Sequence, residues 1–133
     1  MLIEKVKKLI LDKKQFILYS IIGFSGAFID FVAFIILIKI FSLNTIIANA
    51  ISISLGITNN FILNSVFNFK VKDKLKQRFI KFYLIGLFGF FISSLIIYIL
   101  KEVLGVDPII SKLCSIVIVV ILQYSLNKRI TFK

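Results

Sequence analysis

Four long apolar segments constrain this chain more than any other feature of its sequence. They cover residues 16–38, 45–67, 79–100 and 109–127. Each is close to the ~20 residues that a helix needs to cross the hydrocarbon core of a bilayer. Because lipid offers the backbone no hydrogen-bond partner, spanning segments of this kind are helical. We therefore predict an all-α, polytopic membrane protein with four transmembrane helices.

Composition and charge agree with that class. The 133 residues have a mean hydropathy of +1.04, and 59% of them are hydrophobic. A soluble core of this size could not bury so much apolar surface. The net charge is +11, but the basic residues lie mainly between the apolar segments. That location fits the anionic headgroups of a membrane surface and argues against a nucleic-acid partner.

Residues 1–15 precede the first apolar segment and alternate between lysine and aliphatic side chains. Their apolar residues recur at helical spacing, which predicts a short amphipathic helix in the headgroup plane. The alternative is a basic lead-in to the first spanning helix. A cleaved signal peptide is disfavoured, because the apolar run that follows is too long and ends in no small-residue cleavage site. The recurring apolar residues are Leu2, Ile3, Val6, Leu9 and Ile10.

The distribution of basic residues predicts the orientation in the membrane. Five lie before the first span, six in residues 70–81 and three at the C-terminal end. These 14 share one side of a four-helix protein, and the other side carries only Lys39, Lys101 and Lys112. Lysine and arginine accumulate in cytoplasmic segments. We expect a multi-pass protein of the bacterial cytoplasmic membrane with both termini cytoplasmic, and the bias argues against dual topology.

The chain contains an internal repeat. Residues 15–70 align with 78–133 without a gap, at a constant offset of 63. Apolar composition alone would not place glycines, asparagines and lysines in one register. We expect one membrane domain over 1–133, with the basic helix at 1–15, repeat 1 at 16–70 and repeat 2 at 78–133. Each repeat holds two helices, so the repeats are parallel in the membrane. The matched pairs include Gly23 with Gly86, Gly26 with Gly89, Asn64 with Asn127, and Lys70 with Lys133.

Asp30 is the sharpest single polar signal. It lies 14 residues into the first apolar segment, roughly 21 Å from its start in a helix. A carboxyl group at that depth is expensive and faces protein or water. The functional interpretation is a contact to a substrate or ion, and the alternative is a protonated or paired structural group. One specific hypothesis pairs Asp30 with Lys112.

A polar stripe follows the second apolar segment. At 100° per residue the polar and small residues that form this stripe fall within an arc of about 120°. A stripe of this length favours the wall of a polar groove, although interhelical hydrogen bonds could account for part of it. The fourth segment repeats the pattern at its cytoplasmic end. The candidate substrate-binding residues of the groove are Asp30, Asn49, Ser52, Asn60, Asn64, Gln123 and Asn127.

Cations follow these amides at the cytoplasmic side. Aromatic and basic residues there are ordinary membrane anchors, but amides and cations together also match the oxygens of a phosphate. The candidate phosphate-binding residues are Arg78, Lys81, Lys128 and Arg129. The chain has no histidine, and its one cysteine, Cys114, lies in an apolar run. We expect no metal site, no cofactor and no catalytic role.

These motifs together resemble the GtrA-like family of small bacterial membrane proteins. The resemblance covers roughly residues 15–133, and its parts are Gly23 and Gly26 before Asp30-Phe31, Ala48-Asn49-Ala50, Asn60-Phe61-x-x-Asn64 with Phe69, and Tyr124-x-x-Asn127 with Phe132. Two positions depart from the family pattern. Ser65 replaces a basic residue in the first ending, and Ile130 replaces an aromatic residue in the second.

The resemblance implies a role in making cell-surface polysaccharides or in cell-wall glycosylation. It implies that the chain moves a polyprenyl-phosphate-linked sugar, such as an undecaprenyl phosphate derivative, across the membrane. A second hypothesis is a non-transporting partner that anchors or regulates a membrane glycosyltransferase. A third is a proton-coupled exporter with Asp30 as the proton carrier. Small-residue faces on thin helices also make a homo-oligomer plausible.

Overall fold

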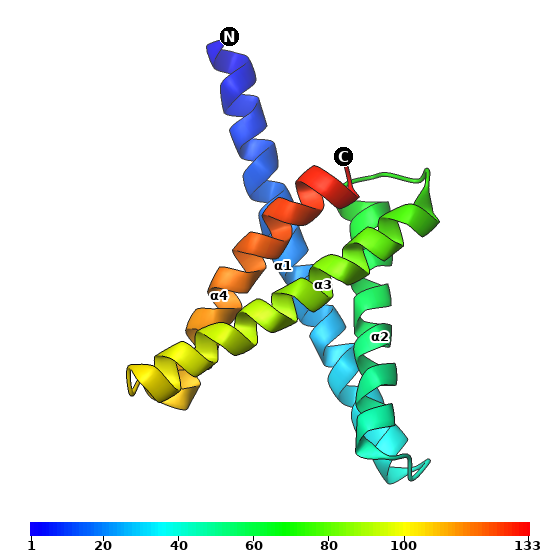
Figure 1. Ribbon diagram of the computed structural model, residues 1–133. Helices are drawn as coiled ribbons and strands as arrows, with labels where there is room; N and C mark the ends of the chain where they lie inside the picture. Colours follow the sequence, from blue (N-terminus) through cyan, green and yellow to red (C-terminus); the bar gives the residue numbers. More distant parts are fainter. The chain divides into compact units, whose positions relative to one another are not determined.

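The computed structural model describes the backbone of residues 1–133 and all side chains except those of residues 45, 46, 108, 109 and 112. Four α-helices follow one another along the chain, and no strand occurs in the described residues (Figure 1). All four are long and apolar enough to cross a membrane. The α-helices are α1 (Leu2–Lys39), α2 (Thr45–Leu63), α3 (Leu75–Tyr98) and α4 (Pro108–Leu126), and π-helical turns follow three of them as η1 (Asn64–Asn68), η2 (Ile99–Val103) and η3 (Asn127–Thr131).

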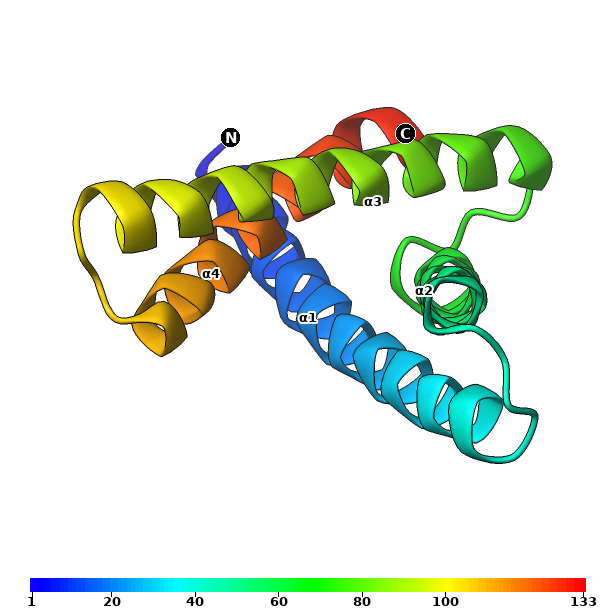
Figure 2. The ribbon, with the colours of Figure 1, turned by 60° about the horizontal axis from the view of Figure 1, so that its bottom comes forward.

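The helices form two compact units, Met1–Asp73 and Lys74–Lys133. We call them the first and the second hairpin. In the first hairpin α1 packs against α2, and in the second hairpin α3 packs against α4 (Figure 2). Each hairpin is a pair of antiparallel helices joined by a short turn, which is the expected solution for two spanning helices close together in sequence.

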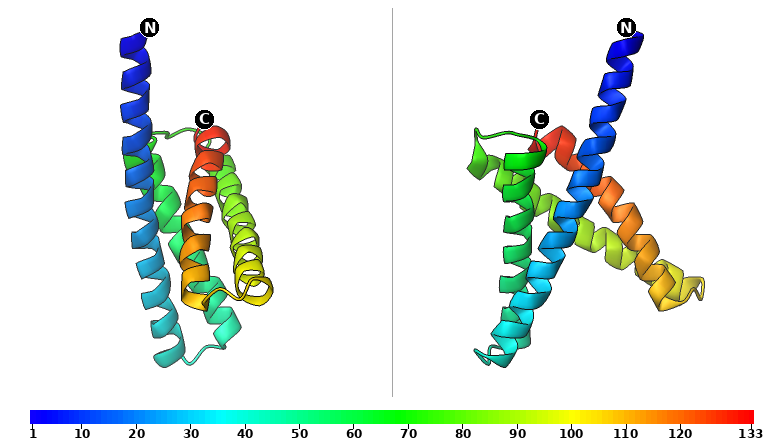
Figure 3. Two further views of the ribbon diagram at one scale, coloured as in Figure 1. Left: turned by 90° about the vertical axis from the view of Figure 1, so that its left-hand side faces the viewer. Right: turned by 180° about the vertical axis from the view of Figure 1, so that it is seen from behind.

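Helix α1 runs from Leu2 to Lys39 without a break. Whether residues 1–15 lie in the headgroup plane or lead straight into the first span stays a prediction. In the structure residues 2–15 form the first turns of α1 and are continuous with it. The physical reason is the absence of any glycine or proline before Gly23, together with good helix formers such as leucine and lysine. In Figure 3 the N-terminal turns of α1 extend well past the end of α2.

The two hairpins share their local structure at an offset of 63 residues. Helices α2 and α4 begin and end 63 positions apart. The turns before them also correspond, because Ser42 and Gly105 both have a positive φ, of 53° and 70°. In these turns the Leu43 N–H donates to the Leu37 carbonyl at 3.1 Å, and the Val106 N–H donates to the Leu100 carbonyl at 2.7 Å. Both bonds satisfy a carbonyl that the end of a helix leaves free.

The same offset relates the ends of the second helix in each hairpin. After η1 the Phe69 N–H donates to the Asn64 carbonyl at 2.8 Å, and after η3 the Phe132 N–H donates to the Asn127 carbonyl at 2.9 Å. These i→i+5 bonds widen the last turn into a π-helix, a rare conformation found often at functional sites. Asparagine opens both π-turns, and its side chain is 1% exposed in each case.

Candidate functional site

An amide side chain lies on a glycine where the two helices of each hairpin cross. Asn60 of α2 packs against Gly26 of α1, and a Cβ at Gly26 would collide with its side-chain amide. In the second hairpin Gln123 of α4 occupies the equivalent place on Gly89 of α3. The glycines leave room for the amides between closely packed helices. Both amides therefore lie within their own hairpin.

The polar side chains of η1 form a network at the end of the first hairpin. The Asn64 side-chain Nδ2 donates to the Asn60 carbonyl at 2.8 Å. The Asn68 Nδ2 donates to the Asn64 Oδ1 at 2.8 Å and to the Gln15 carbonyl on α1 at 3.0 Å. Asn64 thus links α2 to its own π-turn, and Asn68 links that turn to α1. Neither amide nitrogen points freely into solvent.

The corresponding network of the second hairpin uses different residue types. The Thr131 hydroxyl donates to the Asn127 Oδ1 at 2.7 Å. Arg78, at the start of α3, donates through Nη1 to the carbonyl of Thr131 at 2.7 Å and to that of Lys133 at 3.1 Å. Arg78 is buried. Its charge therefore stabilises the C-terminal carbonyls of η3, where a cation is favourable.

The remaining candidate phosphate ligands differ in exposure. Lys81 on α3 and Arg129 on η3 are exposed. The Lys128 ammonium lies 5.7 Å from the centre of the Tyr124 ring and 3.5 Å from its hydroxyl oxygen, a cation–π arrangement. The second hairpin therefore carries exposed positive charge at Lys81 and Arg129, while its Arg78 charge is engaged with main-chain carbonyls.

Asp30 is partly exposed on α1 and faces the crossing with α2. Its Cβ lies 3.3 Å from the position that a Cβ at Gly56 would take. It forms no hydrogen bond or ion pair with the residues whose side chains are described. In the second hairpin Ser93 is equivalent to Asp30, and its hydroxyl donates to the hydroxyl oxygen of Ser115, which is equivalent to Ser52, at 3.2 Å. The hypothesis that pairs Asp30 with Lys112 lies outside the described residues.

Two further candidates on α2 have contrasting surroundings. Ser52 is fully buried, and its hydroxyl donates to the Asn49 carbonyl at 3.1 Å. The Asn49 side chain itself is exposed. The predicted stripe is therefore divided: its central members and those at the η1 end pack against α1 or within η1, and Asn49 does not.

Buried polar atoms without a hydrogen-bond partner gather in the first hairpin. Among the described residues they are Gln15 Oε1, Asn60 Oδ1, Ser65 Oγ and Asn68 Oδ1. Leaving such an atom unpaired costs about 1–3 kcal/mol. Three of the four can only accept a hydrogen bond. The first hairpin therefore contains buried side-chain atoms whose hydrogen-bonding capacity is unused.

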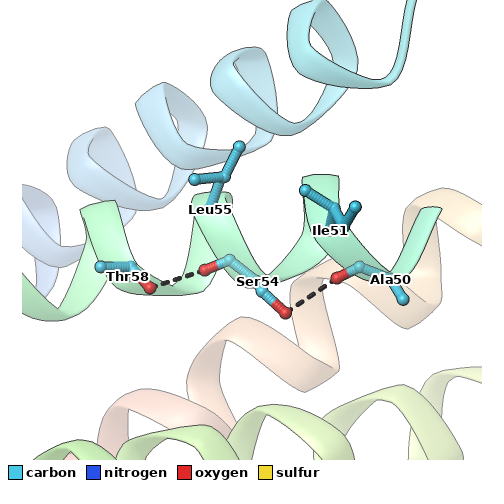
Figure 4. A pocket seen from close by; sticks show the side chains of 5 residues that line it. All are labelled: Ala50, Ile51, Ser54, Leu55 and Thr58. Carbon is cyan, nitrogen blue, oxygen red and sulfur yellow. Dashed lines mark hydrogen bonds between the residues drawn. The ribbon is translucent and has the colours of Figure 1, made fainter. Parts of the chain in front are cut away.

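Several of these residues escaped the sequence analysis. Asn68 lies four residues after Asn64 and corresponds to Thr131 at the offset of 63, so the repeat itself carried the signal. A second hydroxyl stripe on α2 was also missed. Ser54 and Thr58 donate to the carbonyls of Ala50 and Ser54, at 2.8 and 2.7 Å, beside a shallow hollow of about 350 Å³ (Figure 4).

Comparison with known proteins places these features in a family context. A family model described as "GtrA/DPMS, transmembrane domain" matches residues 18–132, which is most of the chain. The match includes both hairpins and begins after the basic first turns of α1. No curated protein matches the chain.

Proposed function

This chain belongs to the GtrA/DPMS transmembrane-domain family, and from that membership we propose that it handles lipid-linked sugars in the membrane as a non-catalytic protein. The finer proposal is translocation: the chain moves a polyprenyl-phosphate-linked sugar across the bacterial cytoplasmic membrane for surface polysaccharide or cell-wall glycosylation. The 14 basic residues on one side favour an orientation in which both termini are cytoplasmic.

One observation carries the proposal: unpaired polar groups concentrate at membrane depth and at one end of the first hairpin. Asp30 has no hydrogen-bond or ion-pair partner among the described side chains. Four buried side-chain oxygens of this hairpin also have no hydrogen-bond partner. Polar groups of this kind are costly in hydrocarbon and mark the path of a substrate or ion. Sugar hydroxyl groups donate hydrogen bonds and therefore complement carboxylate and amide oxygens.

The mechanism follows from the difference between the hairpins. In the second hairpin Arg78, Thr131 and Asn127 are bonded to one another or to the main chain, so this half acts as a brace. The first hairpin would accept the sugar headgroup, while the lipid tail stays in the bilayer. Lys81 and Arg129 are exposed, and they would attract the phosphate through their positive charge.

A second candidate is a non-transporting partner of a membrane glycosyltransferase. The exposed face of α2 around Ser54 and Thr58 favours it, because small and hydroxyl-bearing residues let another helix approach closely. In this case the chain would bind the enzyme or present the lipid carrier to it.

Proteoliposomes containing the purified protein test the two candidates. A labelled polyprenyl-phosphate sugar should become accessible on the opposite leaflet if the protein translocates it. Asn60→Leu should slow this transfer by about tenfold, the effect of losing one to two hydrogen bonds to substrate. Gln123→Met, the equivalent change in the second hairpin, should retain most of the rate.

A second pair of variants isolates the carboxyl group. Asp30→Asn should reduce transfer, whereas Ser93→Ala at the equivalent position of the second hairpin should not. Equal effects in both hairpins would contradict a site in the first one. Absence of transfer by the protein alone, with an increase in glycosyltransferase activity on its addition, would select the partner role.

A further inference from the structure

The first turns of α1 have no counterpart in the second hairpin. Helix α3 begins at Leu75, which corresponds to residue 12 at the offset of 63, so residues 2–11 extend beyond the repeat. The second hairpin shows that two helices of this kind pack without such an extension. The extension is therefore not required by the hairpin fold, and its composition points to another task.

The extension is amphipathic, and its apolar side is uncovered. At 100° per residue Leu2, Ile3, Val6, Leu9 and Ile10 share an arc of about 120°, and Leu11 lies outside it. Leu2, Ile3 and Ile10 are 76%, 70% and 62% exposed. Lys5 and Lys7 flank the arc on its two sides, about 40° beyond its edges. Five lysines stand against Glu4 and Asp12 in residues 1–15. An apolar arc bordered by cations matches a surface of anionic headgroups over acyl chains.

The arc also points away from the packed side of α1. Tyr19, Ile22 and Gly26 are the buried residues of α1, and the middle of the arc lies roughly 160° from their mean direction. The same uncovered side continues into a shallow hollow of about 370 Å³ lined by Lys14, Ile17, Leu18 and Ile21. A cation beside aliphatic side chains again suits the boundary between headgroup and acyl chain.

Gln15 separates the extension from the packed part of α1. Gln15 lies within α1, and its main-chain carbonyl also accepts a hydrogen bond from the Asn68 side chain. A side chain that bonds to a helix carbonyl is a known cause of bending, because it can replace the main-chain bond that a bend breaks. Helix α1 is about 57 Å long at 1.5 Å per residue, nearly twice the ~30 Å hydrocarbon core. A bend at Gln15 would lay the excess on the membrane surface.

We propose that residues 2–14 bind the anionic lipid surface of the membrane that the protein spans, with the apolar arc inserted and Gln15 as the bending point. The occupant is the lipid surface rather than a second copy, because two copies of this lysine-rich segment would repel each other. The proposal does not depend on sugar translocation.

The chain contains no tryptophan, so one introduced residue reports its own surroundings. Leu9→Trp places the tryptophan in the apolar arc. Leu11→Trp, the matched control, places it about 160° away around the helix, leaves the charge of the segment unchanged and lies only two residues further along the chain. The full-length variants are reconstituted into nanodiscs of phosphatidylcholine with or without phosphatidylglycerol. Quenching by brominated lipids reports insertion, and quenching by acrylamide reports exposure to water.

The proposal expects strong lipid quenching of Leu9→Trp in phosphatidylglycerol and much weaker lipid quenching of Leu11→Trp. The signal of Leu9→Trp should be lost in phosphatidylcholine alone and in a variant with Lys5, Lys7, Lys8, Lys13 and Lys14 replaced by glutamine. Acrylamide quenching of Leu9→Trp in both bilayers would overturn the proposal, because the helix would project into water. Protection from both quenchers would overturn it as well, since protein would then cover the arc.

Discussion

At the scale of single residues, the glycines of the helix crossings differ in what encloses them. A Cβ at Gly56 would lie 2.8 Å from the main-chain oxygen of Gly26, whereas a Cβ at Gly23 would meet nothing within 4 Å. The Cβ at Gly89 would meet the end of the flexible Gln123 side chain. Backbone cannot move aside as a side chain can, so the same glycine-to-alanine change has different consequences along one hairpin.

Gly56→Ala should destabilise the first hairpin by about 1–3 kcal/mol, the usual cost of overpacking. Gly89→Ala should cost less, because Gln123 can rotate. Thermal unfolding in detergent, followed by circular dichroism, measures the difference. Gly23→Ala is the matched control and should be neutral or stabilising by up to about 1 kcal/mol, since alanine favours the helix. A loss at Gly23 equal to that at Gly56 would contradict the packing described here.

The turn residues give a second residue-scale prediction. Ser42 adopts a positive φ of 53°, and Gly105 adopts 70° at the equivalent place. A residue with a Cβ is strained there by roughly 1–2 kcal/mol. Ser42→Gly should therefore raise the unfolding temperature, and Gly105→Ala should lower it. The same thermal unfolding experiment measures both shifts in unfolding temperature. A shift of the same sign in both variants would contradict the prediction.

At the scale of the elements, η1 and η3 are each hydrogen-bonded to a neighbouring helix. Arg78 binds the carbonyls of Thr131 and Lys133, and so it holds η3 against α3. Asn68 does the equivalent work for η1 through the Gln15 carbonyl. Each hairpin therefore closes its own end at an equivalent position of the repeat. The second hairpin uses a cation for this contact, and the first uses an amide.

Arg78→Ala should loosen η3 and cost about 1.5–3 kcal/mol, the range for hydrogen bonds to a charged group. Amide hydrogen exchange of residues 130–133 should accelerate, because their carbonyl anchors are lost. Arg129→Ala is the control, since Arg129 is an exposed cation on the same turn. Similar acceleration in both variants would mean that charge near the C-terminus matters and the specific contact does not.

Sequence reasoning located the elements well where a bilayer-length apolar run defined them. The run at 45–67 lies within one residue of α2 and η1 together, and the run at 109–127 contains nearly all of α4. It missed the π-turns, because apolar periodicity does not distinguish a π-turn from the end of an α-helix. Two of them, η1 and η3, also contact a neighbouring helix through Asn68 and Arg78. Sequence reasoning also placed the amides on one face by periodicity. Their seats on Gly26 and Gly89 could not be foreseen, since a helical wheel does not specify where two helices cross.

Removal of residues 2–11 provides a prediction about one element. The buried residues of α1 are Tyr19, Ile22 and Gly26, all beyond the extension, and α3 packs without an equivalent extension. The deletion should leave the unfolding temperature within a few degrees of the full chain, since exposed surface residues contribute little to stability. A large loss of stability in detergent would show that the extension packs against protein.

At the scale of the whole molecule, each hairpin has its own helix contacts and its own closing network. Helical hairpins of this kind can insert into a membrane before they associate, because the bilayer already satisfies their apolar surface. What fixes the direction of insertion is therefore the charge outside the spans. The predicted sides carry 14 and three basic residues, and we expect a bias of this size to select one orientation.

Cysteine mapping tests that orientation. In a Cys114→Ser background the chain has no cysteine, so a single added thiol reports one position. Ser42→Cys and Leu104→Cys lie in the exposed turns between helices, and they should react with a membrane-impermeant maleimide in intact cells. Lys72→Cys and Lys133→Cys should react only after permeabilisation. Labelling of both sets in intact cells would indicate two orientations. Because Lys81 and Arg129 could then face either leaflet, the same experiment also decides whether the proposed phosphate attraction has a defined side.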